Sequence, residues 1–255
     1  MGIAIVFAII SLWFMGISRL REKVLPGMDH TRSRPIVTLR QGRIIGFEAD
    51  ADDEHPQVLE EFLGVPYALS TDGQRRFSPP VTVTASKDDF DARRYGARCP
   101  AGGNDGTPQG EDCLNLNIFR PKIRDEEGKL PVLVYVHGGA FNFGSGNARQ
   151  ISSLVAWSEN PMIGISFNYR VGAFGFLSSK LAAKEGCLNA GLKDQELLFQ
   201  WVQENIAAFG GDAGDVTIMG ASAGAHSVWS SSLQSFQDFL LRVLCKCFQT
   251  CKIPG

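Results

Sequence analysis

A serine framed by two glycines is the group in this sequence best suited to nucleophilic chemistry. The stretch Gly220-Ala221-Ser222-Ala223-Gly224 matches G-x-S-x-G and follows the short apolar run 216–219. Between a strand and a helix, this pattern places the serine on a strained turn that lifts its hydroxyl above the carboxyl edge of a sheet, where a Cβ on either glycine would collide with backbone. The pattern predicts Ser222 as a nucleophile, and the alternative is an ordinary turn rich in glycine and serine.

A second glycine cluster could stabilise the negative charge that an attack by serine creates. The stretch His137-Gly138-Gly139-Ala140-Phe141 begins where the apolar run 131–136 ends. Bare backbone N–H groups can donate to the oxyanion that appears in the tetrahedral transition state of acyl transfer. We expect the N–H groups of Gly139, Ala140 and Ala223 to form an oxyanion hole. The alternative is a glycine turn that only permits tight packing.

A serine nucleophile needs a base, and His226 is the histidine nearest to Ser222 in the sequence. A helical side chain leans over the preceding turn, which invites a contact, but the serine points up from its turn while the helix descends against the sheet. We therefore expect His226 to be a packed or hydrogen-bonded helix residue rather than the base. Of the other three histidines, His30 and His55 lie in polar N-terminal segments, and His137 lies in the glycine cluster.

The elements around these motifs predict an α/β fold. Residues 191–208 place their apolar side chains on one broad helical face, and Gly210-Gly211 ends the helix. The run 132–136 and the stretch 162–170 are typical of buried strands, and 216–219 is a further short strand. Strand, helix and strand in succession indicate a parallel βαβ unit. Near the start, Gln41-Gly42 separates two strand-like runs and predicts a hairpin.

Composition narrows the possible partners. The chain has 255 residues, 44% hydrophobic and 20% charged, with a net charge of −2, which suits one globular α/β domain. A weakly acidic balance offers no surface for nucleic acid or for an anionic membrane. No motif calls for a cofactor, and we expect no metal site, because Cys245, Cys247 and Cys251 lack a fourth ligand.

The N-terminal residues predict entry into the secretory pathway. Residues 1–18 contain an uncharged apolar run that reads as a cleaved signal peptide or as an uncleaved signal-anchor, and a polar linker, 19–34, follows. We expect a secreted protein or, alternatively, one anchored to a membrane by this segment. In an oxidising compartment Cys99 and Cys113 are a plausible disulfide, and the alternative is two free thiols.

Six segments, in this order along the chain, match the pattern of one known family: 62–68, 76–80, 111–121, 134–141, 168–177 and 189–228. Through them the sequence resembles the type-B carboxylesterase family, which includes cholinesterases and fungal lipases. The resemblance implies the N-terminal part of an α/β-hydrolase fold over 35–228, with a mixed, mostly parallel sheet and flanking helices. It also implies carboxylic ester substrates, Ser222 as nucleophile, the three oxyanion donors given above, and Cys99–Cys113 as the first family disulfide.

Two departures from the family argue against choline esters. Cholinesterases carry a glutamate directly before the nucleophile, where this chain has Ala221, and a tryptophan in the first disulfide loop, where this chain has none. The family also supplies its catalytic acid and histidine, in that order, well after the serine. We expect both to be missing here and the chain alone to be inactive or nearly so. A non-catalytic adhesion or binding relative, or a truncated gene product without a separate role, remains the alternative.

Residues 229–255 depart from the family pattern, and we expect an atypical tail. A modest amphipathic helix would use five apolar residues there: Phe236, Phe239, Leu240, Val243 and Leu244. Without the second half of the family domain, we also expect the strand 216–219 to lose a neighbour and become an exposed apolar edge. We accordingly expect an aggregation-prone product.

Overall fold

The computed structural model describes residues 34–102, 107–123, 128–147, 151–234 and 241–246. All elements below belong to the unit Ser33–Gly255. The expected signal segment 1–18 and all but the last residue of the linker 19–34 lie outside the described residues. The same holds for Phe236, Phe239 and Leu240 and for two cysteines of the tail, Cys247 and Cys251.

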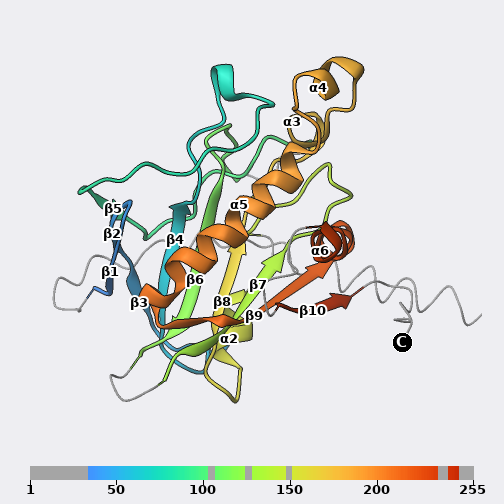
Figure 1. Ribbon diagram of the computed structural model, residues 1–255. Coiled ribbons are helices and arrows are strands. Elements are labelled where there is room, and N and C mark those ends of the chain that lie inside the picture. The colour runs from blue at the N-terminus through green and yellow to red at the C-terminus, as the bar shows by residue number, and fades with distance from the viewer. Residues whose placement is uncertain (1–33, 103–106, 124–127, 148–150, 235–240, 247–255) are drawn as a thin grey trace, which may run out of the picture. The chain divides into compact units, whose positions relative to one another are not determined.

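A seven-stranded mixed sheet forms the centre of this unit (Figure 1). Its strands, in spatial order, are β10 (Leu241–Lys246), β9 (Gly211–Ala221), β7 (Leu130–Val136), β8 (Ile163–Phe167), β6 (Asn115–Pro121), β4 (Leu59–Pro66) and β3 (Phe47–Ala49). Strands β10, β9, β7 and β8 pair in parallel, whereas β8, β6, β4 and β3 pair antiparallel. The sheet is mixed as expected, but among the described strands the antiparallel half is as large as the parallel half.

A smaller three-stranded sheet is built from the predicted hairpin and one later strand. Strands β1 (Ile36–Leu39) and β2 (Gly42–Ile45) pair antiparallel, and β2 also pairs in parallel with β5 (Asp89–Asp91). Gly42 follows the turn at φ +122°, a conformation that favours glycine. The hairpin predicted from the sequence is confirmed.

Helices cover both faces of the large sheet. The longest, α5 (Ala190–Asn205), runs across one face in Figure 1, continues into the 3₁₀ turn η2 (Ile206–Phe209), and packs its apolar stripe into the main core. The short helix α2 (Ile151–Ala156) packs in a second, smaller apolar cluster, which includes Phe119 and Tyr135. Along the strands, successive side chains belong alternately to the main core and to this second cluster, because the pleat points them to opposite faces of the sheet. The remaining helices are η1 (Gly73–Arg75), α3 (Gly172–Phe176), α4 (Lys180–Lys184) and α6 (Ala223–Gln234).

The order of the parallel strands creates a switch point at β7 and β9. After β7 the chain passes through α2 to β8, and after β8 it returns through α5 to β9 on the other side of β7. The connections that follow β7 and β9 therefore leave in opposite directions. In open α/β sheets, ligands bind in the crevice outside the carboxyl ends of such strands. The glycine cluster 137–141 and Ser222 follow these two ends directly.

The C-terminal part of the described chain differs from the sequence-based expectation. Residues 241–246 form a strand, β10, which pairs in parallel with β9 from Leu241 opposite Val216 to Lys246 opposite Ala221. The expected amphipathic helix through Val243 and Leu244 is therefore wrong, and so is the expected exposed edge at 216–219. Unpaired N–H and C=O groups along β9 favour a strand over a helix in the segment that reaches them.

Candidate functional site

Ser222 occupies a left-handed turn between β9 and α6. Its φ is +55°, an uncommon conformation for a residue other than glycine, and its side chain is exposed. The first hydrogen bond of the helix follows at once, from the His226 N–H to the Ser222 carbonyl oxygen at 3.1 Å. The strained turn predicted from the sequence pattern is therefore present, with the strand before it and the helix after it.

The glycines on either side of Ser222 bring three stretches of backbone into contact. A Cβ on Gly220 would lie 2.4 Å from the carbonyl carbon of Gly224, and one on Gly224 would lie 2.2 Å from the carbonyl oxygen of Val136. Real Cβ atoms do not approach backbone this closely, so both positions require glycine. The end of β7, the end of β9 and the start of α6 are packed backbone against backbone, which leaves the turn little freedom to move.

The glycine cluster after β7 lies directly against this turn. A Cβ on Gly138 would be 2.5 Å from the Ala221 carbonyl oxygen and 3.2 Å from the Ser222 Cβ. The next residues form a tight turn, because Gly139 has φ +118° and its carbonyl oxygen accepts from two later N–H groups. The N–H groups of Gly139 and Ala140 make no hydrogen bond to another described residue. Among the described residues, no acceptor competes with a ligand oxygen for these two N–H groups.

The N–H of Ala223 is also available. Ala223 is the first residue of α6, and the first N–H groups of a helix have no partner within it. The three predicted oxyanion donors thus belong to two segments that the glycine contacts hold together. The helix N-terminus adds a partial positive charge on the side where Ser222 lies.

His137 is fully inside the protein rather than in the crevice. Its ring stacks on Tyr169 at a centroid distance of 4.2 Å, and the Tyr169 hydroxyl donates to the His137 carbonyl oxygen at 2.8 Å. Its Nδ1 lies 2.8 Å from the carbonyl oxygen of Gly138 and must carry the proton, because a carbonyl only accepts. Burial lowers the pKa of His137 to about 4, and the bond to Gly138 opposes this only in part. Its Nε2 has no partner among the described residues.

The other described histidines do not serve Ser222 either. The exposed ring of His226 donates through Nδ1 to the backbone oxygen of Ser222 at 3.1 Å, so it is the hydrogen-bonded helix residue that the sequence predicts. His55 is buried, with Nδ1 2.8 Å from Asp52 Oδ1 and Nε2 3.0 Å from Ser152 Oγ, and it ties the N-terminal loop to α2. No hydrogen bond joins Ser222 Oγ to a histidine within the described residues, and His30 lies outside them.

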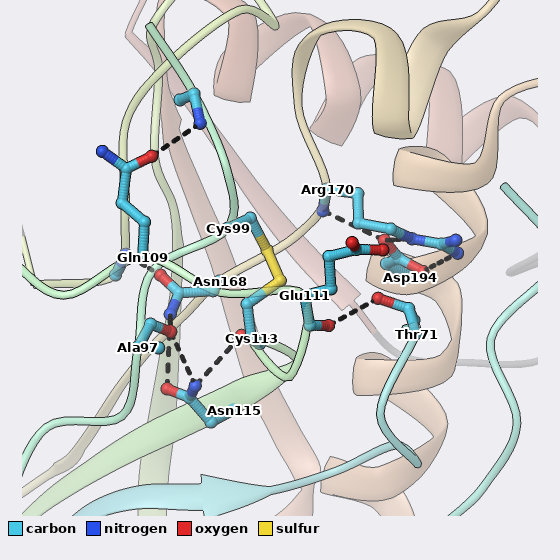
Figure 2. Close-up of a disulfide and its surroundings, with 12 residues drawn as sticks. Thr71, Ala97, Cys99, Gln109, Glu111, Cys113, Asn115, Asn168, Arg170 and Asp194 are labelled. Atoms are coloured by element: carbon cyan, nitrogen blue, oxygen red, sulfur yellow. Dashed lines mark hydrogen bonds and ion pairs between the residues drawn. A yellow bond between two sulfur atoms is a disulfide. The ribbon is translucent and has the colours of Figure 1, made fainter. Parts of the chain in front are cut away.

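The predicted disulfide between Cys99 and Cys113 is present and buried (Figure 2). Asn115 sits beside it and donates to the carbonyl oxygens of Ala97 and Cys113, both at 3.0 Å. Asn168, at the carboxyl end of β8, also donates to Ala97, at 3.1 Å. The disulfide loop is therefore fastened to the same edge of the sheet as the candidate site.

A buried ion pair, which the sequence did not reveal, holds the segment after β8 onto α5. Arg170 donates through Nε and Nη2 to the two carboxylate oxygens of Asp194 at 2.8 and 2.7 Å, and its backbone N–H adds a third bond at 3.0 Å (Figure 2). Both side chains are almost completely buried. Burial raises the pKa of Asp194, and Arg170 opposes this shift. The Arg170 Nη1 also binds the carbonyl oxygen of Ser78.

In the described part of the chain, no cluster of three histidine, cysteine, aspartate or glutamate side chains is arranged to hold a metal ion. No helix there is both long and apolar enough to cross a membrane.

Comparisons with known proteins agree with this architecture. A sequence model of the carboxylesterase family matches residues 33–242. Secreted lipase 4 of Gibberella zeae is 44% identical over 176 residues, which cover 68% of this chain and 32% of that protein. The para-nitrobenzyl esterase of Bacillus subtilis is 36% identical over 200 residues, 76% of this chain and 39% of that protein.

A solved structure of a thermophilic PNB esterase superposes with a TM-score of 0.67 at 36% identity, over 77% of this chain and 40% of that one. The chain thus spans about a third to two fifths of the length of these relatives. The match extends across both the sheet and the segments that carry Ser222 and the glycine cluster, so the α/β-hydrolase fold and the family predicted from the motifs are confirmed. This chain belongs to the carboxylesterase family.

Proposed function

We propose that this chain carries the nucleophile and the oxyanion donors of a carboxylic ester hydrolase. Ser222 Oγ attacks the ester carbonyl carbon, and the N–H groups of Gly139, Ala140 and Ala223 bind the oxyanion. As the tetrahedral intermediate collapses, the alcohol leaves with the proton that the serine hydroxyl gave up. Water then releases the acid from the acyl-serine and returns a proton to Oγ. The observation that carries this proposal is the left-handed Ser222, exposed at the start of α6 and next to a loop in which the N–H groups of Gly139 and Ala140 make no hydrogen bond to another described residue.

A serine hydroxyl is a weak nucleophile without an adjacent base. The rings of His55, His137 and His226 are all engaged elsewhere among the described residues. We therefore propose that the 255-residue chain alone transfers acyl groups slowly, with its residual rate supplied by binding and the oxyanion donors. A non-catalytic role as an adhesion or binding relative is less well supported, because the strained turn at Ser222 is intact.

The substrate class is proposed from the relatives. Their names describe lipases and a para-nitrobenzyl esterase, and carboxylic esters are the chemistry that these names share. Ala221, in place of the glutamate of cholinesterases, argues against choline esters. The buried disulfide and the secreted relatives support a protein of the secretory pathway, released or anchored by residues 1–18.

Labelling with a fluorophosphonate, followed by intact-mass measurement and peptide mapping, tests the nucleophile. We expect slow labelling confined to Ser222, lost in Ser222→Ala and unchanged in Ser178→Ala, a control at another exposed serine. An adduct that forms equally in Ser222→Ala would refute the assignment. Labelling as fast as that of activated serine hydrolases, and lost in Ser222→Ala, would show that the chain supplies a base and that the expected low activity is wrong.

A further inference from the structure

The orientation of one peptide in the glycine cluster depends on the His137 side chain. The Gly138–Gly139 peptide is trans, so its C=O and its N–H point in opposite directions. The C=O end accepts the hydrogen bond from His137 Nδ1 at 2.8 Å. The N–H end, which belongs to Gly139, makes no hydrogen bond to another described residue. Whatever holds the Gly138 oxygen therefore also decides where the Gly139 N–H points.

The ring that makes this bond is itself fixed. The ring is buried and stacks on Tyr169 with an interplanar angle of 15°. The hydroxyl of the same tyrosine also donates to the main-chain carbonyl oxygen of His137. Gly144 leaves the space that the bond needs, because a Cβ there would lie 2.4 Å from the Gly138 oxygen and 2.6 Å from His137 Nδ1. Tyr169 thus packs against the ring, and Gly144 lies against the hydrogen bond itself.

We propose that His137 is a positioning residue for the oxyanion site, whose Nδ1–H holds the Gly138 carbonyl inward and so presents the Gly139 N–H to the oxygen developing beside Ser222. This inference rests on the proposed function and adds a determinant to it. The ring acts as a neutral hydrogen-bond donor throughout the neutral pH range, since burial keeps it unprotonated. It neither donates nor accepts the proton that ester hydrolysis moves.

The test separates a reaction that needs an oxyanion hole from one that does not. In a Ser222→Cys variant of the full chain, acylation by p-nitrophenyl acetate passes through a tetrahedral oxyanion. Alkylation of the same thiol by iodoacetamide is a displacement at carbon and forms none. Peptide mapping by mass spectrometry gives both rates at position 222 alone. Both reactions use the same thiolate, so its population cancels in the ratio of acylation to alkylation, and this ratio reports the oxyanion donors. Ser178→Cys gives the ratio for an exposed thiol without a site.

His137→Phe, made in the Ser222→Cys background, keeps a flat ring against Tyr169 but removes the donor. Loss of a whole oxyanion donor costs about 10²- to 10³-fold in rate, so a misdirected one is expected to lower the acylation rate of the introduced thiol by roughly 10- to 100-fold. Alkylation should change by less than about twofold. His137→Asn places an amide N–H close to the position of Nδ1 and should keep the ratio within about threefold of the parent. His137→Gln places its amide near the position of Nε2, so it should lower the ratio of acylation to alkylation as His137→Phe does.

The outcomes distinguish this inference from the proposed function. If the ratio for Ser222→Cys is no higher than for Ser178→Cys, no oxyanion donors serve position 222 and the proposed function fails. If that ratio is higher but unchanged by His137→Phe, only the role of His137 is refuted. Far-UV circular dichroism identifies a variant that has not folded. If His137→Phe is such a variant, equal ratios for His137→Asn and His137→Gln refute the role, and a preserved ratio in His137→Asn alone supports it.

Discussion

Acid should destabilise this protein through His137, although the ring makes no hydrogen bond or ion pair with an acidic side chain among the described residues. An unfolded histidine takes up a proton near pH 6.5, whereas burial lowers the pKa of His137 in the folded state to about 4. Between these values the unfolded chain binds more protons than the native chain, so the free energy of unfolding falls as the pH falls and levels off below about pH 4. A pKa difference of about 2.5 is worth about 3 kcal/mol, of which roughly 2.5 kcal/mol is lost by pH 4.5.

Urea denaturation at pH 7.5 and pH 4.5, followed by tryptophan fluorescence, measures this loss. Carboxylates also titrate in this range, so the wild type alone cannot isolate the contribution of His137. His137→Asn retains a donor for the Gly138 oxygen and cannot take up a proton, which makes it the matched control. We expect the wild type to lose about 2 to 3 kcal/mol more than His137→Asn between the two pH values. Equal losses in the two proteins would refute the argument, because they would mean that His137 titrates alike in both states.

Three further changes test other parts of the fold by urea denaturation. Asp194→Ala leaves Arg170 buried without its partner and should cost about 3 to 5 kcal/mol, whereas a loss below about 1 kcal/mol would show that water reaches the guanidinium. Ser222→Gly relieves the left-handed backbone and should raise stability by about 1 kcal/mol, with Ser222→Val lowering it; stabilisation by both would argue against strain at this turn. Replacing Cys99 and Cys113 by alanine opens a loop with a sequence separation of 14 and should cost about 3 kcal/mol, and an unchanged midpoint would contradict this.

Much of the candidate site could be predicted from the sequence because its determinants are local. The left-handed turn at Ser222 follows from small residues and two glycines between a strand and a helix, and the structure has that turn. The long helix followed from the spacing of apolar residues within 191–208 and is present as α5 with its 3₁₀ extension. The disulfide was predicted from the family resemblance and from the expected passage through an oxidising compartment, and it pairs the expected cysteines.

Other features depended on where distant backbone lies. The segment 241–246 is compatible with a helix by local pattern, and only the free edge of β9, reached after α6, makes it a strand. The pairing of Arg170 with Asp194 joins the end of β8 to a helix on the sheet face, and no spacing in the sequence connects the two. Such contacts are decided by the strand order, which sequence periodicity does not specify.

The sequence by itself predicted which residues could do chemistry here: a serine in a glycine turn and a second glycine cluster. It did so because a strained turn admits few residue types, and those types stand next to one another in the chain. The sequence also predicted His226 as a helix residue, but the surroundings of His137 were decided only by the tertiary structure. Tyr169, on which the His137 ring stacks, lies thirty-two residues further along the chain and comes beside that ring only because β7 and β8 are paired neighbours in the sheet.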